Sequence, residues 1–411
     1  MPRFFGEVEA LTRPKAPAPN PLDSLALKTG PGEKKLLLYV HVPFCRQKCA
    51  YCAFHSQVYN QVTAAWYVKT LVAEIGLWGR RLNRPKAETL YLGGGTPSLL
   101  SLADLNRIVS AARQSFDLDR DAEITMEANP DSVGDAGWFA SLASLGVNRL
   151  SLGVQSLSDE HLARLGRPHS AAQATSALAL ARRAGLANVG LDLIWGLPGQ
   201  RLQDWLGQLR TVVKELAPQH LSCYGLTQEE GTPFTRRIQA GELTLPPEDE
   251  QARMYVLGAE YLESEGLLHY EISNFARLGF ASRHNSGYWE GRDYLGLGPS
   301  AVSTLGTRRF ANARAMEDYD AAVRQETTGR DFEALDPATL LRERLMLGLR
   351  TTRGALLSDY LALTGKALLA DKKALIQALR QNGLARVNQG RLRLTKNGML
   401  VSSAIISRIL D

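Results

Sequence analysis

Cysteine is scarce in this chain, with four residues among 411. So few cysteines, without disulfide-like spacing, indicate a reducing compartment, and we expect a cytoplasmic location. The chain also lacks any apolar run near the roughly 18 residues of a membrane span, so membrane association is expected only peripherally and through a partner. Residues 1–22 contain acids and prolines but no apolar signal core, so export is not expected.

A concentrated basic segment is absent as well. The net charge of +6 could suit a nucleic-acid partner, but Lys and Arg are dispersed among Asp and Glu, and no RNA-binding motif occurs. We therefore predict no nucleic-acid partner. Hydrophobic residues make up 45% and charged residues 22%, which is typical of a soluble globular protein, and the length allows one large and one smaller domain.

Three of the four cysteines lie within eight positions, at Cys45, Cys49 and Cys52. Three thiolates this close together suit zinc or an iron–sulfur cluster. A structural zinc site normally has four protein ligands, but the position two after Cys52 is Phe54. A cluster with four irons and three cysteines leaves one iron open to a substrate or cofactor. The spacing therefore favours redox chemistry.

Two other interpretations of the cysteines remain open. Cysteine is often a small buried hydrophobe, and His41 or His55 could complete a zinc site with the three thiols. The clustering of three cysteines in a chain with only four argues against chance.

From residue 36 onward, apolar strand-like runs alternate with amphipathic stretches. The runs are Leu36–Val42, Glu88–Leu92, Glu123–Glu127, Arg149–Gly153, Val189–Ile194 and His220–Tyr224. The amphipathic stretches include Ala64–Arg80, Leu102–Ser115, Ala171–Ala184 and Leu202–Leu216. This alternation predicts βα units and a parallel sheet. Six units rather than eight predict an incomplete (β/α)6 barrel, with the active-site loops at the carboxyl ends of the strands.

The pattern also predicts four segments. We expect residues 1–33 to be a flexible lead-in and 34–225 to form the partial barrel. Residues 226–330 extend it and carry YEISNFA and SRHNSGYWEG, after a long helix over Glu248–Glu265. Residues 331–411 read as helices followed by a hairpin and a last helix, which resembles a winged-helix module.

Polar residues follow several of the predicted strands. They are Gly94, Gly95 and Thr96 in YLGGGTPSLL, Glu127 in TMEANPDS, Gln155 in RLSLGVQS, Arg167 in RLGRPH and Asp192 in GLDLIWGLPGQ. Polar residues often cap strand ends, but an acid between Leu191 and Leu193 is expensive without a partner. Together these groups can hold an amino acid and a ribose.

The motifs CRQKCAYC, GGGTP, EANP, GVQS…LGR and DLIWGLPGQ resemble the radical S-adenosylmethionine (SAM) superfamily. More narrowly, they resemble the oxygen-independent coproporphyrinogen III oxidases and the HemW-type heme chaperones, from about residue 36 to 300. The resemblance implies a [4Fe–4S] cluster on Cys45, Cys49 and Cys52, with SAM on the open iron. The implied SAM contacts are Tyr39, Tyr51, Gly94, Gly95, Thr96, Glu127, Gln155, Arg167 and Asp192.

Two features favour the chaperone group over the oxidases. The oxidases carry a further cysteine where this chain has Phe54, and His284, Asn285, Tyr288 and Trp289 match the HNxxYW pattern of the HemW group. The resemblance implies a heme contact at His284; the alternative is an ordinary loop histidine beside packed aromatics. The chain departs from the group at Ala53 and Val302, which stand where Asp and His are usual.

We therefore expect a heme chaperone that binds heme, a [4Fe–4S] cluster and SAM and passes heme to an acceptor protein, with an electron donor as a further partner. The alternative is an enzyme that decarboxylates two propionates of coproporphyrinogen III by radical chemistry. Radical opening of the heme ring on the same scaffold is a third interpretation. Whether the protein is an enzyme stays open at this point.

Overall fold

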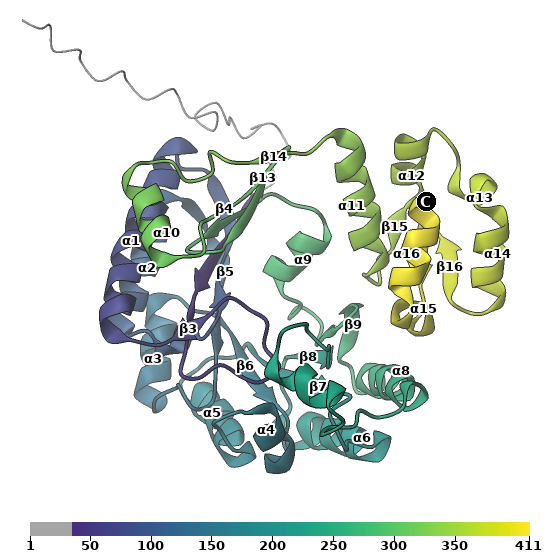
Figure 1. Ribbon diagram of the computed structural model, residues 1–411, viewed down its shortest axis with the longest axis horizontal. Coiled ribbons are helices and arrows are strands. Elements are labelled where there is room, and N and C mark those ends of the chain that lie inside the picture. The colour runs from purple at the N-terminus through teal and green to yellow at the C-terminus, as the bar shows by residue number, and fades with distance from the viewer. Residues whose placement is uncertain (1–34) are drawn as a thin grey trace, which may run out of the picture.

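The computed structural model describes residues 35–411, so the expected lead-in over 1–33 lies outside the described residues. One mixed sheet forms the large domain (Figure 1). Its six central strands run parallel: β1 (Leu36–Val42), β4 (Lys86–Gly94), β5 (Asp117–Ala128), β6 (Arg149–Gln155), β7 (Val189–Trp195) and β8 (His220–Gly225). They contain the six predicted strands, five of them in longer form, and the predicted incomplete barrel is confirmed.

Helices cover the outer face of these strands. They are α1 (Gln61–Arg81), α2 (Leu102–Ser115), α3 (Ala136–Leu145), α4 (Asp159–Leu165), α5 (Ala171–Arg183) and α6 (Leu202–Thr211), which continues as a π-helical turn, Val212–Leu216. A 3-10 turn, Pro97–Leu99, follows β4. Side-chain caps fix most of the helix starts: Asn60, Ser101 and Ser170 each accept backbone N–H bonds of the first turn.

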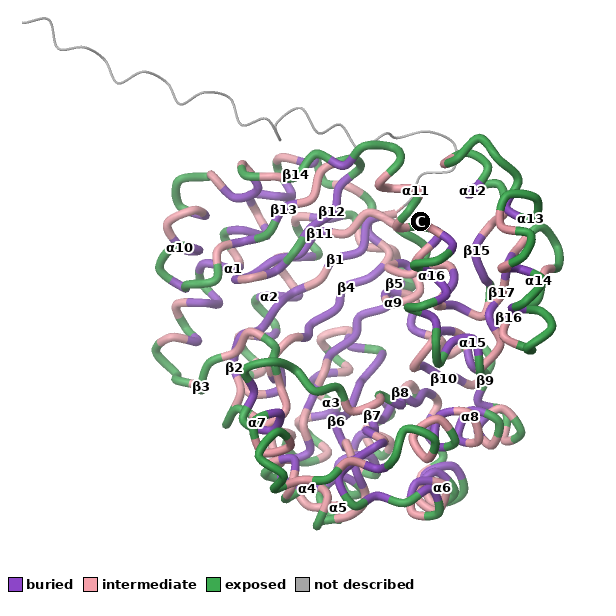
Figure 2. The backbone as a smooth tube through the Cα atoms, turned by 45° about the vertical axis from the view of Figure 1, so that its right-hand side comes forward, coloured by how far each residue is buried: buried purple, intermediate pink, exposed green. Residues whose placement is uncertain are grey.

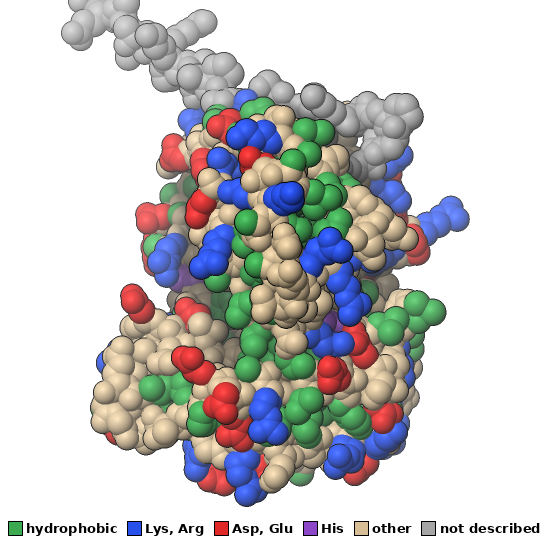
Figure 3. Space-filling model, turned by 90° about the vertical axis from the view of Figure 1, so that its right-hand side faces the viewer, with side chains coloured by type: hydrophobic (Ala, Val, Ile, Leu, Met, Phe, Trp, Pro, Cys, Tyr) green, Lys and Arg blue, Asp and Glu red, His purple; other side chains and the backbone are tan. Residues whose placement is uncertain are grey.

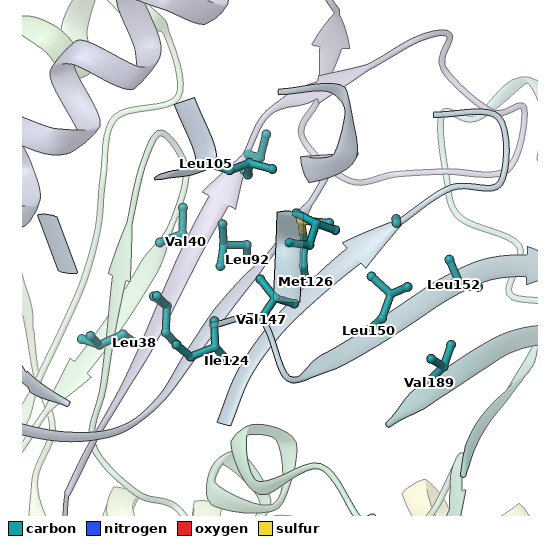
Figure 4. Packing of buried hydrophobic residues seen from close by; sticks show 14 of the residues in the cluster. Leu38, Val40, Leu92, Leu105, Ile124, Met126, Val147, Leu150, Leu152 and Val189 are labelled. Atoms are coloured by element: carbon teal, nitrogen blue, oxygen red, sulfur yellow. The ribbon is translucent and has the colours of Figure 1, made fainter. Parts of the chain in front are cut away.

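The two faces of the parallel strands differ in chemistry because successive side chains point to opposite sides. Leu38, Val40, Leu92, Met126 and Leu150 point outward and pack under the helices as one hydrophobic core (Figure 4). The alternate positions, which point inward, are largely polar. Figure 2 shows the central strands as mostly buried. The outer face therefore holds the fold together, and polar groups gather on the inner face.

The sheet extends beyond the six strands on both sides. On one side β11 (Tyr294–Leu297) pairs parallel with β1, followed by the antiparallel β12 (Val302–Leu305), β13 (Arg308–Ala311) and β14 (Glu333–Ala334). On the other side β10 (Asn274–Ala276) and β9 (Leu268–Glu271) follow β8. Within residues 35–411 the strand order ends at β14 and β9, so the sheet does not close into a full barrel.

Four helices belong to this extension. They are α7 (Pro233–Gln239), α8 (Glu248–Ser264), α9 (Arg283–Trp289) and α10 (Met316–Arg324). Helix α8 matches the predicted long helix. Helix α9 carries the HNxxYW residues, and a barrel residue caps its first turn, because the carboxylate of Glu123 accepts the backbone N–H groups of Arg283 (2.9 Å) and His284 (3.1 Å).

The last part of the chain builds a second, smaller core. Its helices are α11 (Pro337–Leu349), α12 (Leu357–Thr364), α13 (Leu368–Asp371), α14 (Lys373–Gln381), α15 (Lys396–Leu400) and α16 (Ser402–Leu410). The strands β15 (Ala355–Leu356), β17 (Arg391–Leu394) and β16 (Ala385–Asn388) form a three-stranded sheet, which contains the predicted hairpin. This core includes Tyr255 of α8, so it packs directly on the large domain.

The surface of the side that faces right in Figure 1 carries charges of both signs. Figure 3 shows Lys and Arg interspersed with Asp and Glu on this face, so no single-sign patch covers it. None of the helices between residues 35 and 411 combines the length and apolar composition needed to cross a membrane.

Candidate functional site

The three clustered cysteines lie in the loop that follows β1. Cys45 ends the short strand β2 (Phe44–Cys45), which pairs with β3 (Gln57–Val58) on the far side of the loop. The Cys52 N–H donates to the Cys49 carbonyl at 3.2 Å, which tightens the loop. All three thiols are free and partly exposed, whereas Cys223 is buried in β8.

Two donors from other segments point at these sulfurs. Arg167 Nη1 donates to Cys49 Sγ at 3.3 Å, and Thr96 Oγ1 lies 3.8 Å from Cys45 Sγ. The guanidinium also offers further N–H donors to sulfur, and thiolate sulfur is the form of cysteine that binds iron. Among residues 35–411 no three His, Cys, Asp or Glu side chains are arranged as ligands of a single metal ion. The fit to an iron–sulfur cluster therefore rests on the chemistry of the three-thiol set and its cationic neighbour.

The zinc interpretation fits His41 poorly. Both ring nitrogens of His41 are already engaged, Nδ1 with the Tyr39 hydroxyl at 3.1 Å and Nε2 with the His55 carbonyl at 3.0 Å. Burial lowers the pKa of His41, so the ring is neutral and joins β1 to the end of the cysteine loop.

The glycine turn after β4 packs directly against the strand of Cys45. Gly95 N–H donates to the Val42 carbonyl at 2.8 Å and Thr96 N–H to the Phe44 carbonyl at 2.6 Å. A Cβ on Gly95 would lie 2.5 Å from the Phe44 carbonyl oxygen, and Gly94 has a φ of +105°. Only glycine allows this close approach and this backbone conformation. The glycines therefore both form the turn after β4 and let it pack against the backbone of β2.

Glu127, at the end of β5, lies beside this turn. Its carboxylate accepts the Gly94 N–H at 3.0 Å and the Tyr91 hydroxyl at 2.7 Å. Desolvation raises the pKa of Glu127 to about 7, opposed by these hydrogen bonds and helped by the charge of Asp192. Tyr91 was not predicted as a site residue; its place two residues before the glycine turn is the only sequence signal for it.

Arg167 joins three strand ends to the cysteine loop. Besides Cys49, it donates from Nη2 to Asn129 Oδ1 at 2.6 Å and to the Gly153 carbonyl at 2.8 Å. Asn129 in turn donates to Thr96 Oγ1 at 3.0 Å. Arg167 Nε is buried and has no hydrogen-bond partner among the described residues. An orphaned N–H on this guanidinium is suited to a carboxylate such as that of SAM.

The backbone at the end of β6 is closely surrounded by polar side chains. A Cβ on Gly153 would lie 2.8 Å from Asn129 Oδ1, 2.9 Å from the Gln155 side-chain nitrogen and 3.1 Å from Arg167 Nη2, so glycine allows these three polar groups to converge on the backbone. Gln155 itself has a φ of +66°, an uncommon conformation for a residue other than glycine. Asn129 is a residue that sequence reasoning missed, although it stands in the quoted EANP motif.

Asp192 and Tyr51 complete the predicted set. Both oxygens of Asp192 accept from Ser151 Oγ, at 3.1 and 3.2 Å, and desolvation raises the pKa of Asp192. Tyr51 packs against a small apolar cluster that includes Leu165 and Phe234, and burial raises the pKa of its hydroxyl. Tyr51 therefore holds the cysteine loop against the barrel.

His284, the predicted heme contact, lies apart from the cysteine loop at the start of α9. Only 1% of the residue is exposed; Nδ1 lies 2.7 Å from Thr89 Oγ1 and Nε2 lies 3.0 Å from the Tyr288 hydroxyl. Burial lowers its pKa to about 3, and the ring stacks on Tyr91 at 4.9 Å. A bond from Nε2 to heme iron requires the contact with Tyr288 to break.

Two residues differ from those usual in the chaperone group, and both are exposed. Val302 lies on β12 and Ala53 lies in the cysteine loop.

The chain is similar in sequence to known families and to individual proteins. Residues 39–211 match the Radical SAM superfamily and residues 335–401 match the HemN C-terminal domain. The chain is 35% identical to the heme chaperone HemW of Mycobacterium tuberculosis, covering 91% of this chain and 94% of the relative. It is also 35% identical to the mitochondrial radical S-adenosyl methionine domain-containing protein 1 of Mus musculus. That match covers 95% of this chain and 91% of the relative.

A solved structure shows the same fold over most of the chain. The coproporphyrinogen III oxidase HemN of Escherichia coli superposes with a TM-score of 0.79 at 26% identity, covering 94% of this chain and 92% of that one. Similarity to HemW and to HemN over nearly the full length supports the narrower resemblance that the motifs indicated. The superfamily match implies a [4Fe–4S] cluster and SAM as cofactors.

Proposed function

Because the chain belongs to the HemW family of heme chaperones within the radical SAM superfamily, we propose that it binds heme beside a [4Fe–4S] cluster and SAM and passes the heme to an acceptor protein. The observation that supports this most is the similarity to HemW chaperones over more than nine tenths of their length. An electron donor and the acceptor protein are the partners that this function requires, and a cytoplasmic location stays a prediction.

In this proposal Cys45, Cys49 and Cys52 would supply three thiolates to the cluster, and the remaining iron would be left for SAM. A reduced [4Fe–4S] cluster is a low-potential electron donor, the chemistry needed to cleave the sulfonium of SAM. The protein's own part is to bind and orient. Arg167 offers its unpaired Nε–H to the SAM carboxylate, and its bond to the Gly153 carbonyl orients the guanidinium.

The acidic groups of the site act on the cationic and hydroxyl parts of SAM. Glu127, fixed by Gly94 and Tyr91, offers a carboxylate to the ammonium end, and Asp192, fixed by Ser151, accepts from ribose hydroxyls. Three elements fix the cysteine loop around the ligand: the Tyr51 cluster, the Arg167 contact and the glycine turn. Of the nine predicted SAM residues, five lie at or just after the carboxyl ends of strands: Gly94, Gly95, Thr96, Glu127 and Gln155. Tyr51 and Arg167 lie in loops, and Tyr39 and Asp192 lie inside β1 and β7.

Oxidation of coproporphyrinogen III is the second candidate, supported by the match to HemN over the whole chain. Against it, the position of the additional oxidase cysteine holds Phe54, whose side chain is 69% exposed at the edge of the loop. An apolar side chain there supplies no thiol for radical chemistry.

One experiment separates the two functions. The protein, reconstituted without oxygen, is titrated with heme by absorbance and incubated in parallel with SAM, a strong reductant and coproporphyrinogen III, with mass spectrometry as the readout. We expect stoichiometric heme binding and unchanged porphyrinogen. Loss of carboxyl groups matched by 5′-deoxyadenosine would contradict the chaperone assignment and establish the oxidase.

A further inference from the structure

A cavity of about 380 Å³ lies between α9 and the C-terminal core. In Figure 1, α9 lies between the barrel strands and α11, and the cavity is lined by residues of α9, of α11 and of the segment that leads into β15. It is separate from the cysteine loop, and none of the predicted SAM residues lines it. Its volume is within the range of small-molecule sites.

Three arginines from three different segments line this cavity: Arg344 of α11, Arg353 of the following loop and Arg391 of β17. Arg344 Nη1 is 3.5 Å from Asp359 Oδ1, Arg353 pairs with Glu290, and Arg391 Nη1 donates to the Gly354 carbonyl at 2.8 Å. A guanidinium carries five N–H donors, so each of these contacts leaves others for a ligand. The two ion pairs are partly exposed and therefore weak enough to exchange for a ligand.

The cavity wall also has an aromatic part. Trp289, the last residue of the HNxxYW motif, and Tyr270 both line it. The Tyr270 hydroxyl lies 2.7 Å from His220 Nε2 at the start of β8, which fixes the ring between the cavity and the barrel. His284 of the same motif contacts barrel residues instead. Helix α9 therefore presents its two ends to two different environments.

The charges limit the kind of ligand. Three arginines face two acids, Glu290 and Asp359, in the same wall, so the cavity suits a ligand with one or two negative charges rather than a polyanion. Guanidinium groups bind carboxylates with a defined planar geometry, and an indole face packs on a flat apolar ring. A flat apolar ring that carries carboxylates on one edge matches both parts of the wall.

We infer that this cavity binds the carboxylate-bearing edge of the tetrapyrrole cargo, with Arg344 and Arg391 on its propionates and Trp289 against the ring. The inference rests on the proposed function, since it locates the cargo that a heme chaperone carries. It gives the C-terminal core a role: two of the three arginines come from this core and the third from the loop inside it, so the large domain alone does not complete the site.

The test compares heme with its dimethyl ester, in which the propionates are uncharged. Arg344→Gln and Arg391→Gln are expected to weaken heme binding by roughly tenfold each, the effect of one charge-assisted hydrogen bond, and to leave binding of the ester unchanged. Arg386→Gln, which removes an exposed arginine from β16 outside the cavity, is the control and should bind heme normally. Trp289→Leu is expected to weaken binding of both ligands.

The outcomes of this titration distinguish failure of the inference from failure of the proposed function. Equal heme affinity of the wild type and both cavity variants overturns the inference but leaves the proposed function standing. A loss of equal size for heme and ester also overturns it, because the contact then does not involve carboxylates. Absence of heme binding in every form, including the wild type, overturns both. Two variants on separate elements, α11 and β17, keep the result interpretable if one of them folds poorly.

Discussion

The ionisation of Glu127 predicts how SAM affinity depends on pH. Its carboxyl lies inside the strand-end site, and desolvation raises its pKa to about 7. SAM carries a cationic sulfonium and an ammonium, so it binds better when Glu127 is ionised. The affinity of the wild type is therefore expected to rise as pH rises through 7, because the fraction of Glu127 in the charged form rises.

The size of this effect follows from the pKa. A group with a pKa of about 7 is about one tenth ionised at pH 6 and about nine tenths ionised at pH 8, which is roughly a tenfold change in affinity, or about 1.4 kcal/mol. Glu127→Gln removes the titration with little change in structure. The remaining oxygen still accepts the Gly94 N–H, and the new amide can donate to the Tyr91 hydroxyl, which accepts as readily as it donates.

The assay is equilibrium binding of SAM to the anoxically reconstituted protein at pH 6, 7 and 8. The ratio of dissociation constants, Glu127→Gln over wild type, cancels the titration of free SAM, whose amino group also ionises near neutral pH. We expect the ratio to grow about tenfold from pH 6 to pH 8. The control is Glu74→Gln, since burial raises the pKa of Glu74 to about 7 as well, but this residue bonds to Gly298, Asn312 and Tyr319 away from the site. A constant ratio for Glu127→Gln, or an equal slope for the control, would refute the reasoning.

Four further predictions concern the cluster, the crowded Gly153, the buried carboxyl and the motif histidine. Cys45→Ala is expected to abolish the cluster, measured as bound iron and sulfide, while Cys223→Ala keeps it; full iron content in the first variant would rule out the assigned ligand. Gly153→Ala places a methyl group 2.8 Å from Asn129 Oδ1 and is expected to weaken SAM binding more than tenfold with an unchanged cluster spectrum. Glu74 has a folded-state pKa of about 7 against an ordinary 4.5, so the folded chain holds a proton that the unfolded chain has released, and stability falls as pH rises from about 5 to 7. Between pH 5 and pH 8 this loss amounts to about 2.5 kcal/mol, and Glu74→Gln is expected to remove it from the stability measured in denaturant titrations at these two pH values; an unaltered pH dependence would contradict the argument. His284→Ala is expected to weaken heme binding, whereas Tyr288→Phe, which leaves the ring in place, should not.

The strands and the general place of the site could be predicted because both depend on local patterns. A parallel strand covered on its outer face gives a nearly continuous apolar run, as in LLLYVHV, and the polar residues that end such strands must meet at one edge of the sheet. The structure places Glu127 beside the glycine turn that contacts β2, while Arg167, which follows α4 rather than a strand, contacts Cys49. The place of the strand ends could be predicted without knowledge of these side-chain contacts.

Other features depend on contacts between distant segments and left no local pattern. Strand β11 has four residues, two of them apolar leucines and one a glycine, which is too short a pattern to distinguish from a loop, yet it pairs with β1 in parallel. Asn129 becomes part of the site only because Arg167, 38 residues away, donates to it. The arginine-lined cavity likewise forms only when α11 and β17 pack beside α9.

The motif histidine shows how a pattern and a structure can assign different roles to one residue. The family resemblance implies that His284 is a heme ligand, whereas the structure shows both ring nitrogens engaged, with Thr89 and Tyr288. Either role predicts weaker heme binding in His284→Ala, but through different physics. Loss of an iron ligand must shift the heme absorption bands, while loss of an anchor for α9 displaces Trp289 and lowers affinity with the bands unchanged. The spectrum of the bound heme, rather than the affinity, therefore decides which role His284 has.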